Sequence, residues 1–182
     1  MLTMKDILKD GHPLLRTKAK PVQIPATEEE KNTLNQMLEF LINSQNPESA
    51  EKYQLRPGIG LAAPQIGVQK RMIAVHVTDD KDKLFSHTLF NPKIISHSIE
   101  LTYLEGGEGC LSVDEDFPGH VPRYARITLT GVDLDDRPVK LRLRGLPSIC
   151  FQHEIDHLDG IMFYDRIDKN NPYEVYGKPV HR

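Results

Sequence analysis

The chain has 182 residues, of which 38% are hydrophobic and 27% charged, a composition typical of one soluble globular domain covering residues 1–182. Its net charge of -3 does not indicate a basic surface for nucleic-acid binding. No apolar run is long enough for a secretion signal or a membrane span. The two cysteines, Cys110 and Cys150, are too few for a disulfide framework, so we expect a reducing cytoplasm in which a thiol can bind metal.

The first predicted helix begins at Thr27 and ends near Asn43. Thr27 and Glu30 match the capping-box pattern, and the acidic residues after Thr27 suit the positive end of the helix dipole. Apolar residues then recur at helical spacing, namely Leu34, Met37, Leu38, Leu41 and Ile42. Residues 44–57 are polar, contain two prolines and predict a surface loop with room for a short helical turn.

Strands are expected at residues 72–77, 127–134 and 139–143, with a hairpin turn at residues 135–138. They follow one another without the strand–helix alternation of parallel sheets, which favours an α+β fold with antiparallel or mixed sheets. A second helix is expected over residues 147–160, because a proline begins this range and a glycine ends it. It is apolar on most sides, which predicts a buried helix at the centre of the domain.

The second helix contains His153, Glu154 and His157 in an HExxH pattern. The two histidines are one turn apart, so both rings can hold one ion, and Glu154 lies where a base for a bound water belongs. Buried polar side chains of this kind are costly unless they are paired or bound. A hydrogen-bonded cluster without metal is the alternative.

The third ligand has two candidates. One zinc-protease pattern continues with a glycine and a third histidine, but the last position is Phe163. Glu174, in a polar tail without helical signature, would complete the site of a zinc metalloendopeptidase, which is our alternative function. Cys110 would give a Cys-His-His site with a fourth position open to water, the arrangement of a catalytic centre. Cys110 as a buried packing residue has equal weight here.

Residues 58–67 form a glycine-rich segment, GIGLAAPQIG. It does not fit a dinucleotide fingerprint, because no strand precedes it and Pro64 would break the required helix. We expect a backbone that approaches a ligand closely, since glycines leave room. Gln65 is the only polar side chain, and its amide could donate to a developing oxyanion. A surface turn with a solvated glutamine is the alternative.

Three segments in order resemble the peptide deformylase family. Gly58–Gln65, Glu108–Ser112 and Gln152–His157 match its Gly-x-Gly-Leu-Ala-Ala-x-Gln, Glu-Gly-Cys-Leu-Ser and Gln-His-Glu-x-Asp-His motifs. Residues 10–16 also match the family's N-terminal segment. The insertion at residues 44–57 and the short tail resemble the second bacterial subtype, whose chain ends in a strand.

The resemblance implies hydrolysis of the N-formyl group from the formylmethionine of nascent polypeptides, with release of formate. It implies Cys110, His153 and His157 as ligands of Fe(II), which nickel, cobalt or zinc can replace. Glu154 is then the general acid–base. Gln65 and the backbone amide of Leu111 form the oxyanion hole.

The peptide substrate is expected to pair as an added strand with the glycine run and with the segment around Gly109. This gives Ile59, Gly60 and Gly109 as substrate-binding residues. An apolar pocket is expected for the methionine side chain, with Ile59, Phe151 and Ile155 as its wall.

For two further residues, Cys150 and Asp156, we expect structural roles. Cys150 is expected to be a packing residue. Asp156 is expected to pair with a buried arginine, Arg123 or Arg126, or to orient a metal ligand. The resemblance also implies a bacterial cytoplasmic location and a contact with the exit region of the ribosome, and the chain has no membrane partner.

Overall fold

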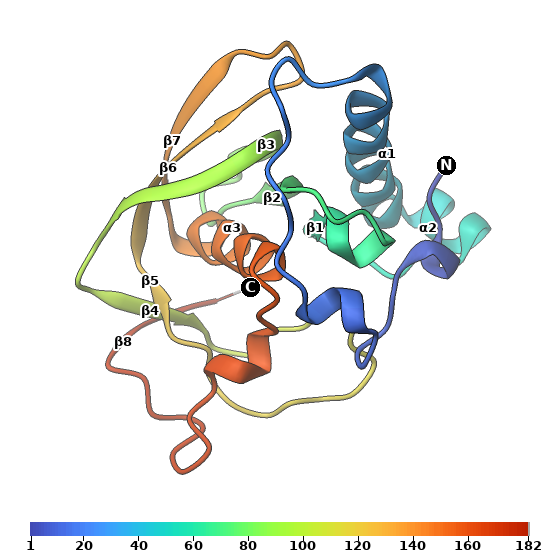
Figure 1. The fold of residues 1–182 in the computed structure, drawn as a ribbon. Helices are drawn as coiled ribbons and strands as arrows, with labels where there is room; N and C mark the ends of the chain where they lie inside the picture. Colours follow the sequence, from blue (N-terminus) through green and yellow to red (C-terminus); the bar gives the residue numbers. More distant parts are fainter. Residues whose placement is uncertain (182) are drawn as a thin grey trace.

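The computed structural model describes residues 1–181, in which three α-helices lie among the strands of two β-sheets (Figure 1). Helix α3 packs against strands of both sheets, whereas α1 and α2 pack against each other, α1 lying along the larger sheet. Every helix within residues 1–181 is too short or too polar to cross a membrane. The α-helices are α1 (Glu28–Gln45), α2 (Pro47–Tyr53) and α3 (Gly145–Leu158).

The larger sheet has five antiparallel strands in the order β1-β2-β3-β6-β7, which leaves β1 at an edge. The hairpin expected around residues 135–138 joins β6 and β7. The strands are β1 (Gly60–Ala62), β2 (Met72–Thr78), β3 (Leu84–His97), β6 (Arg126–Val132) and β7 (Pro138–Arg144).

The smaller sheet has the order β5-β4-β8 and is mixed, because β4 pairs antiparallel with β5 and parallel with β8. The loop between β4 and β5 carries Cys110. The α+β class with antiparallel and mixed sheets is thus confirmed. The three strands are β4 (Leu101–Leu104), β5 (Arg123–Tyr124) and β8 (Gly177–Val180).

The start of α1 follows the capping-box prediction. The backbone N–H of Glu30 donates to Thr27 Oγ1 at 3.2 Å, and the Thr27 N–H donates to the Glu30 carboxylate at 2.8 Å. The helix continues to Gln45, two residues past the expected end, and Asn46 caps the next helix. Residues 44–57, expected as a loop, therefore contain α2, which is seven residues long and begins at Pro47.

Strand β2 is buried on both faces, which explains its continuous apolar sequence. Met72 and Ala74 point into the cluster that includes the α1 side chains. Ile73 and Val75 point the other way, into the cluster with Phe151 and Leu158 of α3. One helix thus covers each face of the sheet, and α3 is fixed against the strand that neighbours β1.

Helix α3 begins at Gly145, two residues before the expected start, and all of its residues from Pro147 to Leu158 are buried. It is the third and last α-helix within residues 1–181. Gly160 ends the helical segment with a φ of 72°, and a Cβ there would lie 2.7 Å from the Arg16 backbone. The helix end is therefore held closely against the N-terminal segment.

Candidate metal centre and catalytic site

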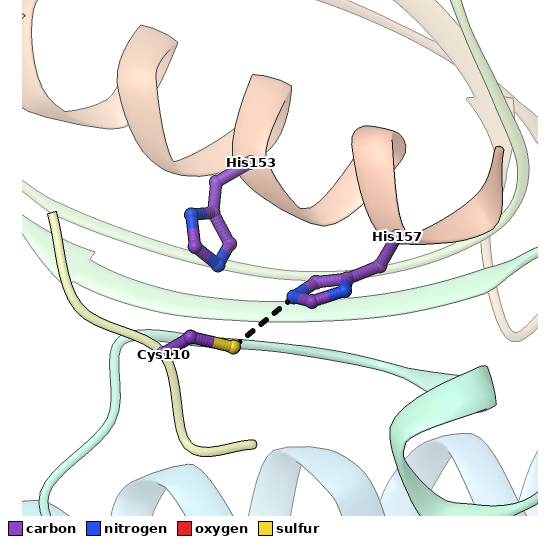
Figure 2. Close-up of side chains that lie close together, drawn as sticks. All are labelled: Cys110, His153 and His157. Atoms are coloured by element: carbon purple, nitrogen blue, oxygen red, sulfur yellow. Dashed lines mark hydrogen bonds between the residues drawn. The ribbon is translucent and has the colours of Figure 1, made fainter. Parts of the chain in front are cut away.

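Three potential ligands converge beside α3 (Figure 2). His153 and His157 project from one face of the helix, and Cys110 approaches from the loop after β4. One ligand atom from each residue lies within 4.8 Å of the others, and Cys110 Sγ is 3.3 Å from His157 Nε2. The structure therefore places Cys110, for which the sequence alone left metal binding and packing equally open, beside both histidines.

These residues fit a metal ion by their chemistry. A thiolate and two imidazoles are ligands for Fe, Co, Ni and Zn, and three protein ligands leave a position for water or substrate. Burial acts to lower the pKa of His153, but hydrogen bonding with Cys110 and Glu108 raises that pKa well above its ordinary value. The negative surroundings that favour a proton on this ring equally attract a metal cation.

Glu108 orients the first histidine. Its carboxylate lies 2.8 Å from His153 Nδ1, which places the proton of a neutral ring on Nδ1 and leaves Nε2 for the centre. Burial would raise the pKa of Glu108, but the charge of Arg123 and the hydrogen bond from His153 outweigh it and lower the pKa to about 2. Glu108 is therefore a carboxylate at neutral pH.

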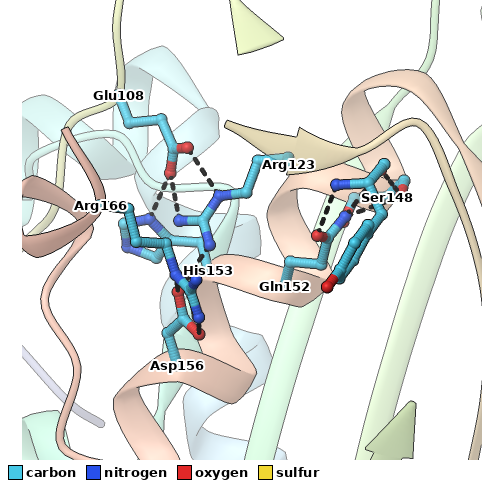
Figure 3. A network of polar contacts seen from close by, with 8 residues as sticks. Glu108, Arg123, Ser148, Gln152, His153, Asp156 and Arg166 are labelled. Atoms are coloured by element: carbon cyan, nitrogen blue, oxygen red, sulfur yellow. Dashed lines mark hydrogen bonds and ion pairs between the residues drawn. The ribbon is translucent and has the colours of Figure 1, made fainter. Parts of the chain in front are cut away.

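Arg123 connects Glu108 to α3 (Figure 3). Its guanidinium, 1% exposed, donates to both Glu108 carboxylate oxygens at 2.9 Å and to Asp156 at 2.6 Å. Arg166 donates two further hydrogen bonds to Asp156, at 2.6 and 2.7 Å. The expected pairing of Asp156 with Arg123 is found, whereas Arg126 pairs with Glu100 instead.

Gln65 is buried and its amide is held in one orientation. Its Oε1 accepts from the Ala62 N–H at 2.9 Å, so its Nε2 faces Cys110 Sγ at 3.4 Å and Ser112 Oγ at 3.1 Å. The segment that carries it, η3 (Ala63–Ile66), follows β1 directly. An amide N–H therefore points toward the metal centre, and the solvated alternative is excluded.

Glu154 lies 3% exposed beside the centre, and its Oε2 has no hydrogen-bond partner among residues 1–181. Burial raises the pKa of this carboxyl to about 7. A Cβ at Gly60 would lie 2.2 Å from Glu154 Oε1. The glycine therefore provides the space that the carboxylate occupies, in agreement with the expected close approach of this backbone.

A cavity of about 370 Å³ leads to these groups. Gln65, Leu111 and Glu154 line it at one end, together with Cys110 and His153, and Ile59, Gly60 and Gly109 form part of its sides. Its apolar wall is formed by Ile59, Leu104, Leu146, Ile149 and Cys150.

Two residues expected in this wall lie elsewhere, because Phe151 and Ile155 are on the side of α3 that packs into the core. Cys150 occupies the wall instead, with its Sγ 3.6 Å from the Ile59 carbonyl. Glu174 is exposed, accepts from Tyr176 Oη at 2.6 Å and is outside the ligand group.

The family model for polypeptide deformylases matches residues 4–173. The chain belongs to this family. It is 64% identical to peptide deformylase 2 of Bacillus cereus, with both chains covered in full. It is 62% identical to peptide deformylase 2 of Bacillus subtilis over 96% of this chain and 95% of that one.

Solved structures of the family have the same fold. The peptide deformylase of Thermus thermophilus superposes with a TM-score of 0.71 at 35% identity, over 91% of this chain and 86% of that one. A probable peptide deformylase from Synechococcus phage S-SSM7 gives a TM-score of 0.71 at 38% identity, over 88% and 97%. Family membership makes the chain a metal-dependent hydrolase that removes the formyl group from N-formylmethionine peptides, and disfavours the metalloendopeptidase.

Proposed function

We propose that the cleft performs this hydrolysis with Cys110, His153 and His157 as metal ligands and Glu154 as general acid–base. Gln65 Nε2 and the backbone N–H of Leu111 are the proposed oxyanion donors. The observation that carries the proposal is the convergence of three ligand atoms within 4.8 Å at the end of a cavity that Glu154 and Gln65 also line.

Fe(II) is the proposed resident metal, with nickel, cobalt or zinc as replacements. Cys110 Sγ and one ring nitrogen from each of His153 and His157 would hold it. When bound, the metal polarises the carbonyl and lowers the pKa of water, so that attack occurs near neutral pH.

The residues of the chain move the protons and hold the developing charge. Glu154 accepts a proton from the attacking water and returns it to the leaving amine, for which a pKa of about 7 is suited. Gln65 and Leu111 donate to the formyl oxygen as it becomes negative. The products are formate and a peptide with a free amino terminus.

The peptide is proposed to bind as a strand along residues 58–60. Ile59 accepts a hydrogen bond from the His76 N–H at 2.8 Å, so one edge of this segment is already paired with β2. The other edge is available to substrate, because β1 is an edge strand. Gly60 and Gly109, which both line the cavity, would bind its backbone, and the apolar wall beside Ile59 would hold the methionine side chain.

The proposed setting is the bacterial cytoplasm, near the exit region of the ribosome, with residues 1–182 acting as one deformylase domain. Two observations support it. Neither Cys110 nor Cys150 forms a disulfide within the described residues, and a reducing compartment keeps a thiolate ligand from oxidation. The substrate carries its formyl group only at the start of a newly made chain.

The test compares formyl-Met-Ala-Ser with acetyl-Met-Ala-Ser, with metal content measured on each preparation. We expect turnover of the formyl peptide alone. Glu154→Gln should retain metal and lose roughly 10²-fold or more in kcat, whereas Cys110→Ser should lose metal. Glu174→Gln is the matched control and should change neither quantity. Full metal occupancy in Cys110→Ser would contradict the proposed ligand set.

A further inference from the structure

The cavity has a charged residue at its mouth that the chemistry above does not use. Arg56 lines the cavity, and its side chain is 43% exposed. Apart from the two cysteines, the remaining titratable residues that line it within the described chain are Glu108, His153 and Glu154, whose side chains are all nearly inaccessible to solvent. The cavity therefore presents a single fixed cation to whatever extends out of it.

The guanidinium of Arg56 is held in place through Nη1 alone, which leaves its other N–H groups able to bind a substrate. Its Nη1 donates to the Val113 carbonyl at 2.9 Å and lies 3.4 Å from Asp114 Oδ1. Asp114 has a closer partner in Lys9, at 2.7 Å, and the Lys9 hydrogen bond is the largest cause of its lowered pKa. Two cations thus share one carboxylate here, and no other described residue accepts from the remaining N–H groups of Arg56.

The distance from the reacting end can be counted along the chain. Gly60 lies directly beside the Glu154 carboxylate, because a Cβ at this position would clash with Glu154 Oε1. Gly60 is buried whereas Arg56 and Pro57 are exposed, so the substrate chain leaves the cavity toward Arg56. At about 3.3 Å per residue, four residues of extended chain cover roughly 13 Å. A peptide that pairs with residues 58–60 and continues in this direction therefore brings its third or fourth residue level with Arg56.

We propose that Arg56 is a specificity-determining residue that favours substrates with a carboxylate at about the third residue from the formyl group. This inference rests on the proposed peptide-binding mode. The carboxylate is either an acidic side chain or, in a short peptide, the C-terminal group. Arginine suits this role because its planar fork binds carboxylates through paired N–H groups.

The test measures kcat/KM for formyl-Met-Ala-Glu-amide and formyl-Met-Ala-Gln-amide, which differ only in charge. The wild-type enzyme should prefer the glutamate peptide about threefold to fivefold at low ionic strength, as expected for an exposed ion pair. The preference should lie mainly in KM and should decline in high salt. The free acid of formyl-Met-Ala-Gln distinguishes the two possible carboxylates, the acidic side chain and the C-terminal group. A higher kcat/KM for this free acid than for formyl-Met-Ala-Gln-amide would show recognition of the terminal carboxylate.

Arg56→Gln should reduce these preferences to a ratio near one, and Arg56→Lys should retain part of them through its charge. Arg126→Gln, which replaces an exposed arginine paired with Glu100, is the matched control and should keep the wild-type ratio. An unchanged ratio in Arg56→Gln, or no preference in the wild type, would overturn the proposal while hydrolysis itself stands. Absence of turnover on all formyl peptides would instead refute the proposed function.

Discussion

The side-chain amide of Gln65 is held in one orientation, which suits it to donate a hydrogen bond to the reacting oxygen. Its oxygen is held by the Ala62 N–H, and its nitrogen is left facing the sulfur of Cys110. Gln65→Ala should lower kcat on the order of 10²-fold, the typical cost of removing one oxyanion donor, while metal content is unchanged. Gln69→Ala, which removes an amide bound to the Leu14 carbonyl, should leave kcat near normal. Equal rates in both variants would show that Gln65 does not contact the reacting oxygen.

Arg123 supports the proposed metal centre by holding the carboxylates of Glu108 and Asp156 in place. Arg123→Ala would leave the carboxylates of Glu108 and Asp156 buried without their shared cation, at a cost of about 3–5 kcal/mol in unfolding free energy. Because Glu108 orients His153, we also expect metal affinity to fall about 10- to 100-fold. Urea unfolding of the metal-bound enzyme and metal titration measure the two effects. Arg126→Ala should change unfolding free energy by at most about 0.5 kcal/mol, and unchanged metal affinity in Arg123→Ala would remove its positioning role.

For individual residues, the sequence predicted relative positions correctly where helical spacing alone determines them. The helical spacing of His153 and His157 predicted one shared face, and the structure has it. The wall of the cavity was harder to predict, because Ile59, Leu104 and Leu146 come from separate segments that only the tertiary fold brings together. Arg166 was missed for the same reason, since it reaches Asp156 from beyond the end of α3.

The N-terminus of α1 carries a prediction at the scale of one element. Burial would raise the pKa of Glu30, but hydrogen bonds from Lys70 and Thr27 outweigh it and leave the pKa below its ordinary value. A lowered pKa means that the stabilisation is present above the ordinary carboxyl pKa of about 4.3 and is lost as the pH falls through the folded-state value. Glu30→Gln should therefore destabilise the protein by about 0.5 kcal/mol at pH 7, a value reduced by solvent screening at the half-exposed Lys70.

The difference in unfolding free energy between wild type and Glu30→Gln should shrink between pH 5 and roughly pH 3, followed by urea titration at each pH. Glu29→Gln changes an exposed carboxylate of the same first turn, which carries no hydrogen bond from Lys70, and is the matched control. A difference that grows on acidification would contradict the assigned direction of the pKa.

Elements with strong local signals agree with their predictions, and those shaped by tertiary contacts do not. The capping box located α1, and the apolar run located β2. Strand β3, fourteen residues long, was not predicted. Pro92 interrupts its pattern, and its pairing with β6 shifts register between Phe90 and Lys93 and again between Ile94 and Ser96. Such bulges break the alternation on which strand prediction depends.

At the scale of the whole molecule, the proposed metal centre connects parts of the chain that are distant in sequence. Cys110 belongs to the loop after β4, and both histidines belong to α3. An ion bound by both segments stabilises only the folded state, so a chelator should lower Tm on the order of 5–15 °C. Thermal unfolding of Cys110→Ser should show no further decrease with chelator. A wild-type Tm that is insensitive to chelation would argue against a shared ion.

The topology was only partly accessible from the sequence. Runs of strands indicated antiparallel sheets, which five of the strands form. The parallel pairing of β4 with β8 had no local signal, because it joins segments that are more than seventy residues apart, Leu101–Leu104 and Gly177–Val180. Contacts of that range are set by the packing of the whole fold.

The position of β1 has a consequence for the proteins on which the enzyme acts. The strand begins at Gly60 beside the buried Glu154, so in the proposed binding mode a substrate would reach the reacting groups as extended backbone. A chain whose amino terminus has already folded into a helix or a sheet of its own cannot enter. In this binding mode, removal of the formyl group would have to precede the folding of the substrate's first residues.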